Sequence, residues 1–316
     1  MPRTRLEQFP KKNREAIARW LEVHAEVDSN TRDIVEQSRD ILCTNIAGLR
    51  SRPPRPGYAY GSEANLVASE LGILASELTH RAIAKRLVSD CPDELAHGIY
   101  LASRLRYVAN LAKTFKYSGS DCQHVFDMIL SAAANDGNAV AAYLWRYDYT
   151  AKKGHPFAVL LCNAMRMILN SQSDDDLVAK LHRQKDTAYD KATLLALAAI
   201  AERNPESVTG NLLAMLSGHG RKESNNVMLQ YFAMPVHAIF KVACDCFAVS
   251  GIASPVAPDS ALWDAPAHAR IHESPAVHDI NVLVVLSPTI LKWAVSLPES
   301  VPDHAFASLF AEGSVT

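Results

Sequence analysis

Glycine, which β-rich chains need at their many turns, is scarce in this sequence. Only 13 of the 316 residues are glycine. Alanine and leucine are abundant instead, in stretches such as LLALAAIAER and SAAANDGNAVAAYLW. These residues lose little conformational freedom when they enter a helix. The composition therefore argues against a β-rich fold and favours helices.

Cysteines are few, and long apolar runs are missing. The six cysteines are scattered in apolar or helical contexts, without the density of a disulfide scaffold. No uninterrupted apolar run reaches the roughly 18 residues that predict a membrane span. The N-terminus, MPRTRLEQFPKKNREAI, lacks the apolar stretch of a signal peptide. We therefore expect a protein of the reducing cytoplasm with no membrane partner.

The chain also lacks an excess of charge of either sign, because its formal net charge is −2. Such a balance gives no overall attraction to nucleic acid or to an anionic membrane, so neither is an expected partner. The charge is unevenly distributed, however. Residues 1–60 carry 11 Lys/Arg and 8 Asp/Glu, whereas residues 235–316 carry 3 and 8. This acidic C-terminal region could face a basic partner, but we favour a solvated surface as the explanation.

Helical periodicity runs through most of the sequence. Residues 1–60 predict two helices and the loop SRPPRPGYAYGS, in which three prolines and two glycines exclude regular helix. Residues 61–250 predict the main helical domain. Residues 251–316 predict an irregular connector and C-terminal helices packed on that domain, with INVLVVL as the one β-like run, which a buried helix also explains. We expect an all-α fold, either an irregular multi-helix bundle or a short stack of antiparallel helix pairs.

The segment HESPAVHDI, residues 272–280, brings two histidines, a glutamate and an aspartate together. Its HD dipeptide invites comparison with HD-class phosphohydrolases, in which histidines and aspartates hold a metal that activates water. His237, His278, Asp279 and Asp303 could form such a site. However, His272 and His278 do not share a helical face, and Asp279 also suits an N-cap. We therefore predict a connector without metal and keep the phosphohydrolase as an alternative.

Other catalytic signals are missing. The sequence has no G-x-S-x-G, H-E-x-x-H, Walker or G-x-G-x-x-G motif. Cys244 and Cys246 would diverge on a helix and are expected to pack as small apolar side chains. Ser173 is expected to cap a helix, and the acidic triplet after it would favour the positive end of the helix dipole without any metal. We therefore expect neither an enzyme nor a cofactor.

Arginine and aromatic residues gather in two short stretches, RPGYAY at 55–60 and WRYDYT at 145–150. Such residues dominate protein-binding hot spots because they bring large contact areas and polar tips at modest entropic cost. The alternative is that Trp145 and one tyrosine of each stretch are simply buried. The residues predicted to contact a partner are Arg55, Tyr58, Tyr60, Arg146, Tyr147, Tyr149, Asp174, Asp175 and Asp176.

The segment YDKATLLALAAIAERNPESVTGNLLAMLSGHG, residues 189–220, with the apolar helices expected upstream at 156–169, resembles the immunity protein 49 family of bacterial polymorphic toxin systems. The resemblance covers residues from about 60 to 250. It implies a mostly helical protein that inhibits a cognate protein toxin by tight binding, and it assigns no residue roles. A non-catalytic helical scaffold or adaptor is the alternative, and a homodimer stays open.

Overall fold

The computed structural model describes residues 5–23, 31–51, 63–89, 91–112, 120–223, 228–272 and 278–302, together with residues 305, 306 and 309. Within these ranges it contains thirteen α-helices and no β-strand, so the predicted all-α fold is confirmed. None of these helices has the length and apolar character that crossing a membrane requires.

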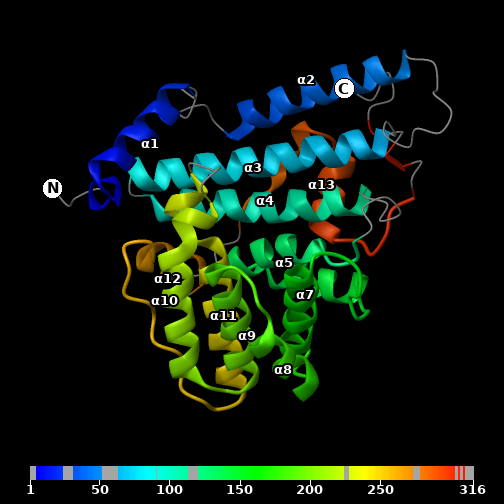
Figure 1. Ribbon diagram of the computed structural model, residues 1–316. Helices are drawn as coiled ribbons and strands as arrows, with labels where there is room; N and C mark the ends of the chain where they lie inside the picture. Colours follow the sequence, from blue (N-terminus) through cyan, green and yellow to red (C-terminus); the bar gives the residue numbers. More distant parts are fainter. Residues whose placement is uncertain are drawn as a thin grey trace.

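The centre of the molecule is an antiparallel pair of long helices, α3 (Glu63–Ser89) and α4 (Pro92–Ala112) (Figure 1). Buried apolar side chains lie around most of α3 rather than along one stripe, because other elements cover it on several sides. One of them is α2 (Thr31–Arg50), which packs on α3 through Ile34, Leu42 and Ile46. This α3–α4 hairpin is the base on which the other elements are arranged.

The two helices of the hairpin approach closely at Gly98, so substitution there should be costly. A Cβ atom at this position would lie 2.5 Å from the Cβ of Ala82. We expect Gly98→Ala to lower the free energy of unfolding by about 1–3 kcal/mol in urea titrations, because it overpacks the contact. Gly210→Ala in α10 (Pro205–Lys222) is the control, since nothing lies within 4 Å of its added Cβ. That variant should gain about 0.5–1 kcal/mol from helix propensity. Equal effects of the two substitutions on the free energy of unfolding would contradict a close approach of α3 and α4 at Gly98.

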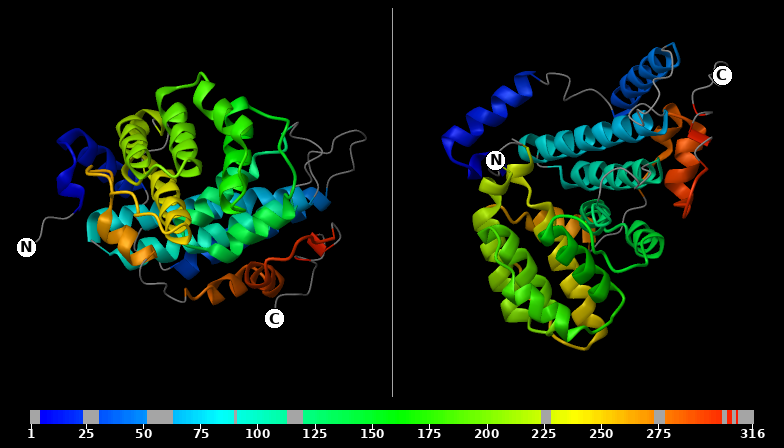
Figure 2. Two further views of the ribbon diagram at one scale, coloured as in Figure 1. Left: turned by 90° about the horizontal axis from the view of Figure 1, so that it is seen from below. Right: turned by 45° about the vertical axis from the view of Figure 1, so that its right-hand side comes forward.

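A second group of five helices extends away from the hairpin, on the side opposite to α2 (Figures 1 and 2). Its central member is α9, which is buried along most of its length as its alanine and leucine content predicts. The turn into α10 is formed by Arg203, whose φ is 57°, and by Asn204, whose side chain accepts from Ser207 N. The five helices are α7 (Pro156–Leu169), α8 (Asp175–Arg183), α9 (Ala188–Ala201), α10 (Pro205–Lys222) and α11 (Met234–Val249).

Shorter elements complete the fold. INVLVVL forms the 3₁₀ helix η5 (Asn281–Val285) rather than a strand. The predicted connector is interrupted by α12 (Ala265–His272), so the expectation of irregular structure is wrong there. The remaining elements are η1 (Arg5–Gln8), α1 (Lys11–Val23), α5 (His124–Ala133), α6 (Gly137–Arg146), η4 (Leu229–Tyr231) and α13 (Pro288–Ser296).

Two clusters of buried apolar side chains hold these elements together. The larger one extends from Ile34 in α2 to Leu309, and the smaller one joins Phe9 and Ile17 to the adjoining ends of α3 and α4 and to α12. Each of the three predicted segments contributes to the larger cluster. The three segments therefore share one core rather than each forming a core of its own.

A buried carboxylate, Asp264, fastens distant parts of the chain to one another. It caps the start of α12 through Ala267 N at 3.1 Å. Arg86 of α3 binds both of its oxygens at 2.8 and 2.9 Å, and the Nε of Arg5 lies 3.1 Å away. All three side chains are almost completely withdrawn from solvent. One residue therefore joins the N-terminal segment, the hairpin and α12.

Candidate partner-binding site

The stretch WRYDYT lies at the end of α6 and in the loop that follows it. Trp145 is 72% exposed and Tyr149 is 38% exposed, whereas Tyr147 is only 5% exposed. An indole is normally among the more buried side chains, so the exposure of Trp145 is unusual. We use the name aromatic site for residues 145–149.

Arg146 fixes the backbone of the aromatic site. Its guanidinium donates to the carbonyl oxygens of Asn110 and Glu299 and, through Nε, to the hydroxyl of Tyr147. It also lies over the Tyr147 ring, 5.5 Å from the centroid. Most of the donors of Arg146 are therefore used within the molecule, and its role is to hold the neighbouring aromatic residues in place.

Tyr147 is the buried anchor of the site. Its ring stacks on His124 with 3.8 Å between centroids. The hydroxyl of Tyr149 donates to the carbonyl of Asp121 at 2.9 Å, and Asp148 pairs with Arg166 at 2.8 Å. Trp145 and Tyr149 are thus presented from a rigid base, which lowers the entropic cost of binding.

A cysteine and a histidine lie beneath Tyr147, with the Sγ of Cys162 3.4 Å from the Nε2 of His124. Burial lowers the pKa of His124 to about 4 and raises the pKa of the Cys162 thiol to about 12. Both groups are therefore neutral at pH 7, unlike the thiolate–imidazolium pair of a cysteine nucleophile. The pair supports the packing of Tyr147.

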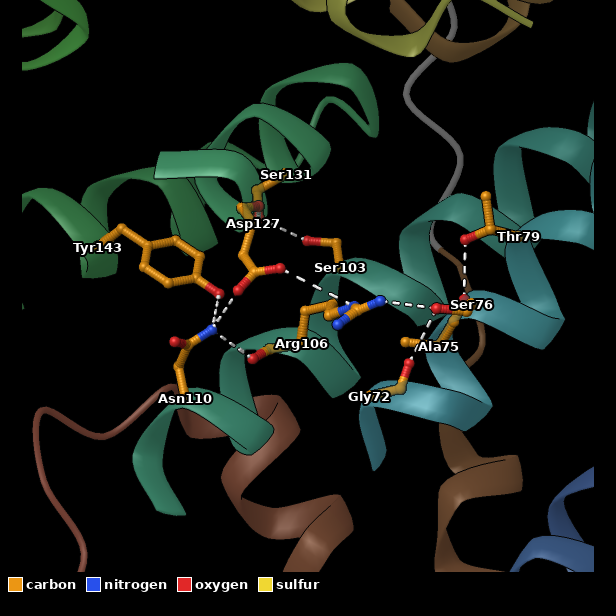
Figure 3. Close-up of polar contacts among 10 residues, drawn as sticks. All are labelled: Gly72, Ala75, Ser76, Thr79, Ser103, Arg106, Asn110, Asp127, Ser131 and Tyr143. Atoms are coloured by element: carbon orange, nitrogen blue, oxygen red, sulfur yellow. Dashed lines mark hydrogen bonds and ion pairs between the residues drawn. The ribbon is translucent and has the colours of Figure 1, made fainter. Parts of the chain in front are cut away.

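A polar network behind the aromatic site joins four helices (Figure 3). Asn110 of α4 donates to Asp127 of α5 at 2.6 Å and to the hydroxyl of Tyr143 of α6 at 3.3 Å. Arg106 lies 3.8 Å from Asp127 and donates to Ser76 of α3 at 2.7 Å. Such fully connected networks rigidify the elements that they join. The network extends the support of the site to the hairpin.

The acidic triplet lies apart from the aromatic site, beyond the far end of α7, whose 14 residues span about 21 Å. Asp174, not Ser173, is the N-cap of α8, because its carboxylate accepts from Leu177 N at 2.9 Å. Asp175 and Asp176 are exposed in the first turn. Arg55, Tyr58 and Tyr60 lie outside the described residues. The structure therefore places those predicted contacts that it describes on two separate surfaces.

The residues of the phosphohydrolase alternative do not converge. His237 is buried between the rings of Phe232 and Trp263, at 4.6 and 4.2 Å. His278 instead packs against Tyr100 of α4 at 4.7 Å, and Asp279 accepts from Asn281 N. Asp303 lies outside the described residues. In the part of the chain that the structure describes, no three His, Cys, Asp or Glu side chains are placed to hold a metal ion.

His237 belongs instead to a row of three imidazoles that the sequence did not reveal. His237 and His268 are buried, and His272 is half-buried. Its Nδ1 lies 3.3 Å from the Nδ1 of His268, and the rings of His268 and His272 are 4.4 Å apart. Burial lowers the pKa of His268 to about 4 and that of His272 to about 3, and it holds the pKa of His237 well below the ordinary value. The row packs α12 against α11 in its neutral form.

A groove of about 420 Å³ lies between α2, α3 and α4. Its floor is apolar, and its charged groups occur as opposite pairs. The Nζ of Lys85 lies 2.7 Å from Glu94, and the Nε of Arg81 lies 2.6 Å from Glu77. Because these charges neutralise one another, the groove favours no ligand of a particular charge.

No family model matches the chain, and neither the curated proteins nor the solved structures contain a match. The resemblance to immunity protein 49 therefore stays a prediction. The fold places the protein in the all-α class.

Proposed function

We propose that the protein binds and neutralises a cognate bacterial protein toxin by direct occlusion, and that the aromatic site is part of its contact surface. The observation that carries the proposal is the exposure of Trp145, at 72%, on a base fixed by Arg146 and Tyr147. Tryptophans and tyrosines are enriched among the few residues that carry most of the binding energy in protein interfaces. Binding of this kind requires no catalytic group.

The resemblance of residues 189–220 supports the choice of a toxin as the partner. In the fold this segment forms most of α9 and α10, an antiparallel pair in the second helical group. A non-catalytic scaffold would use the same aromatic site but would bind several harmless partners. The phosphohydrolase alternative has weaker support, because His237 and His278 lie in different clusters.

Co-expression with the protein encoded immediately upstream tests the proposal. We expect that neighbour to stop growth alone and this protein to restore growth by forming a complex. Trp145→Ala should weaken the complex by about 2 kcal/mol or more, roughly thirtyfold, as loss of an interface hot spot does. The unfolding midpoint of the Trp145→Ala variant should equal that of the wild type, because the Trp145 side chain contributes little to the core.

Ile73→Ala is the matched control, since it also removes an exposed apolar side chain but lies on α3. It should leave the affinity unchanged. A harmless or unbound neighbour would contradict the toxin proposal. A complex that tolerates Trp145→Ala as well as Ile73→Ala would instead exclude the aromatic site.

A further inference from the structure

Residues 246–258, CFAVSGIASPVAP, begin in the last turn of α11, continue beyond its end and contain no charged side chain. Much of this segment is nevertheless on the surface. Val249 is 86% exposed and Val256 is 74% exposed. Isolated exposed apolar residues are ordinary, whereas exposed apolar side chains that gather on one surface mark interaction sites. We call residues 246–258 the uncharged strap.

The strap has a defined backbone. Gly251 ends α11 with a φ of +66°, and Ile252 N donates to the carbonyl of Phe247 at 2.9 Å, which closes a Schellman-type cap. Pro255 and Pro258 are buried and restrict the chain further. The hydroxyl of Thr209 in α10 donates to the carbonyl of Val256 at 3.0 Å. The backbone of the strap is therefore ordered before any partner binds.

The strap lies at the end of the second helical group that is farthest from the hairpin, where the start of α8 and the turn between α9 and α10 also lie (Figure 1). His182, in the last turn of α8, lies 2.7 Å from Glu202 at that turn, so the end of α8 contacts the turn directly. We call this surface the distal end and define it as residues 170–176, 202–206 and 245–258.

Charge at the distal end is predominantly negative. Its one Lys or Arg residue is Arg203. Asp245 is neutralised by Lys241, whose Nζ lies 2.6 Å from it. The other exposed carboxylates of the distal end, which we call its acidic rim, are Asp174, Asp175, Asp176, Glu202 and Glu206. Exposed valines together with this acidic rim are complementary to an apolar segment that carries lysines or arginines.

We infer that the distal end is a docking surface for a basic amphipathic segment of a protein partner, whose apolar side chains contact Val249 and Val256 and whose cations face the acidic rim. The inference rests on the proposed function only for the class of the partner, a protein. It adds a second contact surface and specifies the charge of what binds there.

The test uses the full-length protein and a short labelled helical peptide with one lysine face and one leucine face. Fluorescence anisotropy measures the affinity, and backbone amide NMR locates the contact. We expect the shifted amides to fall within the distal end and the affinity to decrease with salt. Glu202→Gln with Glu206→Gln should weaken binding roughly tenfold, because two rim charges are lost.

Two controls make the result decisive. Glu15→Gln with Glu22→Gln removes the same charge from exposed positions on α1 and should leave the affinity unchanged. A peptide with glutamates in place of the lysines should not bind. Shifts outside the distal end, equal losses in both double variants or no binding would each overturn the inference. The upstream neighbour is not used, so a failure here is distinct from a failure of the toxin proposal.

Discussion

Asp136→Asn should lower the free energy of unfolding by about 3–5 kcal/mol, the effect of removing one partner of a buried ion pair. The Nε of Arg104 lies 2.6 Å from the Asp136 carboxylate, and both side chains are at most 5% exposed. Arg104 also donates to the carbonyl of Ala294 in α13 and to the hydroxyl of Tyr100. Asparagine keeps the shape but leaves the guanidinium charge uncompensated.

Urea unfolding measures this effect, and Asp148→Asn is the matched control. Asp148 forms its ion pair with Arg166 at 2.8 Å but is 66% exposed. Exposed pairs contribute about 0–1 kcal/mol, so the control should unfold close to the wild type. If the two variants were equally stable, the charge of Asp136 would not be needed to compensate Arg104.

Acidification should destabilise the protein steeply, starting near pH 6.5, the ordinary histidine value. His237, His268 and His272 have pKa values below that value in the folded state. The unfolded chain therefore binds more protons than the native chain as the pH falls. Each group then lowers stability by about 1.4 kcal/mol per pH unit, or roughly 4 kcal/mol for the three, until its folded pKa is reached.

The charged groups around this row explain why protonation is unfavourable. Lys241 and Arg5 raise the local positive potential, whereas Asp264 is occupied by Arg5 and Arg86. His219 on α10 adds a further imidazole that faces His237. Protonation would therefore add a cation to a buried region that already contains cations. Weakening of the contact between α11 and α12 is the expected structural result.

His272→Phe tests the histidine explanation directly. Both ring nitrogens of His272 are buried without a hydrogen-bond partner. Phenylalanine should therefore be tolerated near pH 7, and the slope of stability against pH should fall by about 1.4 kcal/mol per pH unit. Urea midpoints measured at about pH 7 and about pH 5 give both quantities. An unchanged slope would assign the acid sensitivity to other groups.

The fold class could be predicted because alanine, leucine and helical periodicity are local signals. Helix α12 escaped prediction because it has only eight residues, in a stretch rich in proline. Its N-cap, Asp264, followed by Pro266 in the first turn, was nevertheless a readable start signal. The Arg86–Asp264 pair spans 178 residues, and no local pattern specifies such a contact.

The aromatic site was predicted as a stretch of sequence, but its orientation was not. Ala139 and Tyr143, four residues apart, mark the buried face of α6. Trp145, two residues after Tyr143, is rotated by about 200° around the helix and therefore faces outward. Helical spacing from Tyr143 would therefore have identified Trp145 as the exposed residue of the WRYDYT stretch. The stacking of Tyr147 on His124 depends on where α5 lies, which the sequence of α6 does not contain.

The contact between the N-terminal segment and the region around Asp264 has a consequence for synthesis on the ribosome. Arg5 donates to the carbonyl of Ala261, 256 residues later in the chain. At roughly 5–20 residues per second, those residues take about 13 to 50 seconds to translate. The nascent N-terminal segment cannot reach its final position during that interval. Docking of η1 is therefore a late step of folding, whereas the α3–α4 hairpin can pair as soon as it emerges.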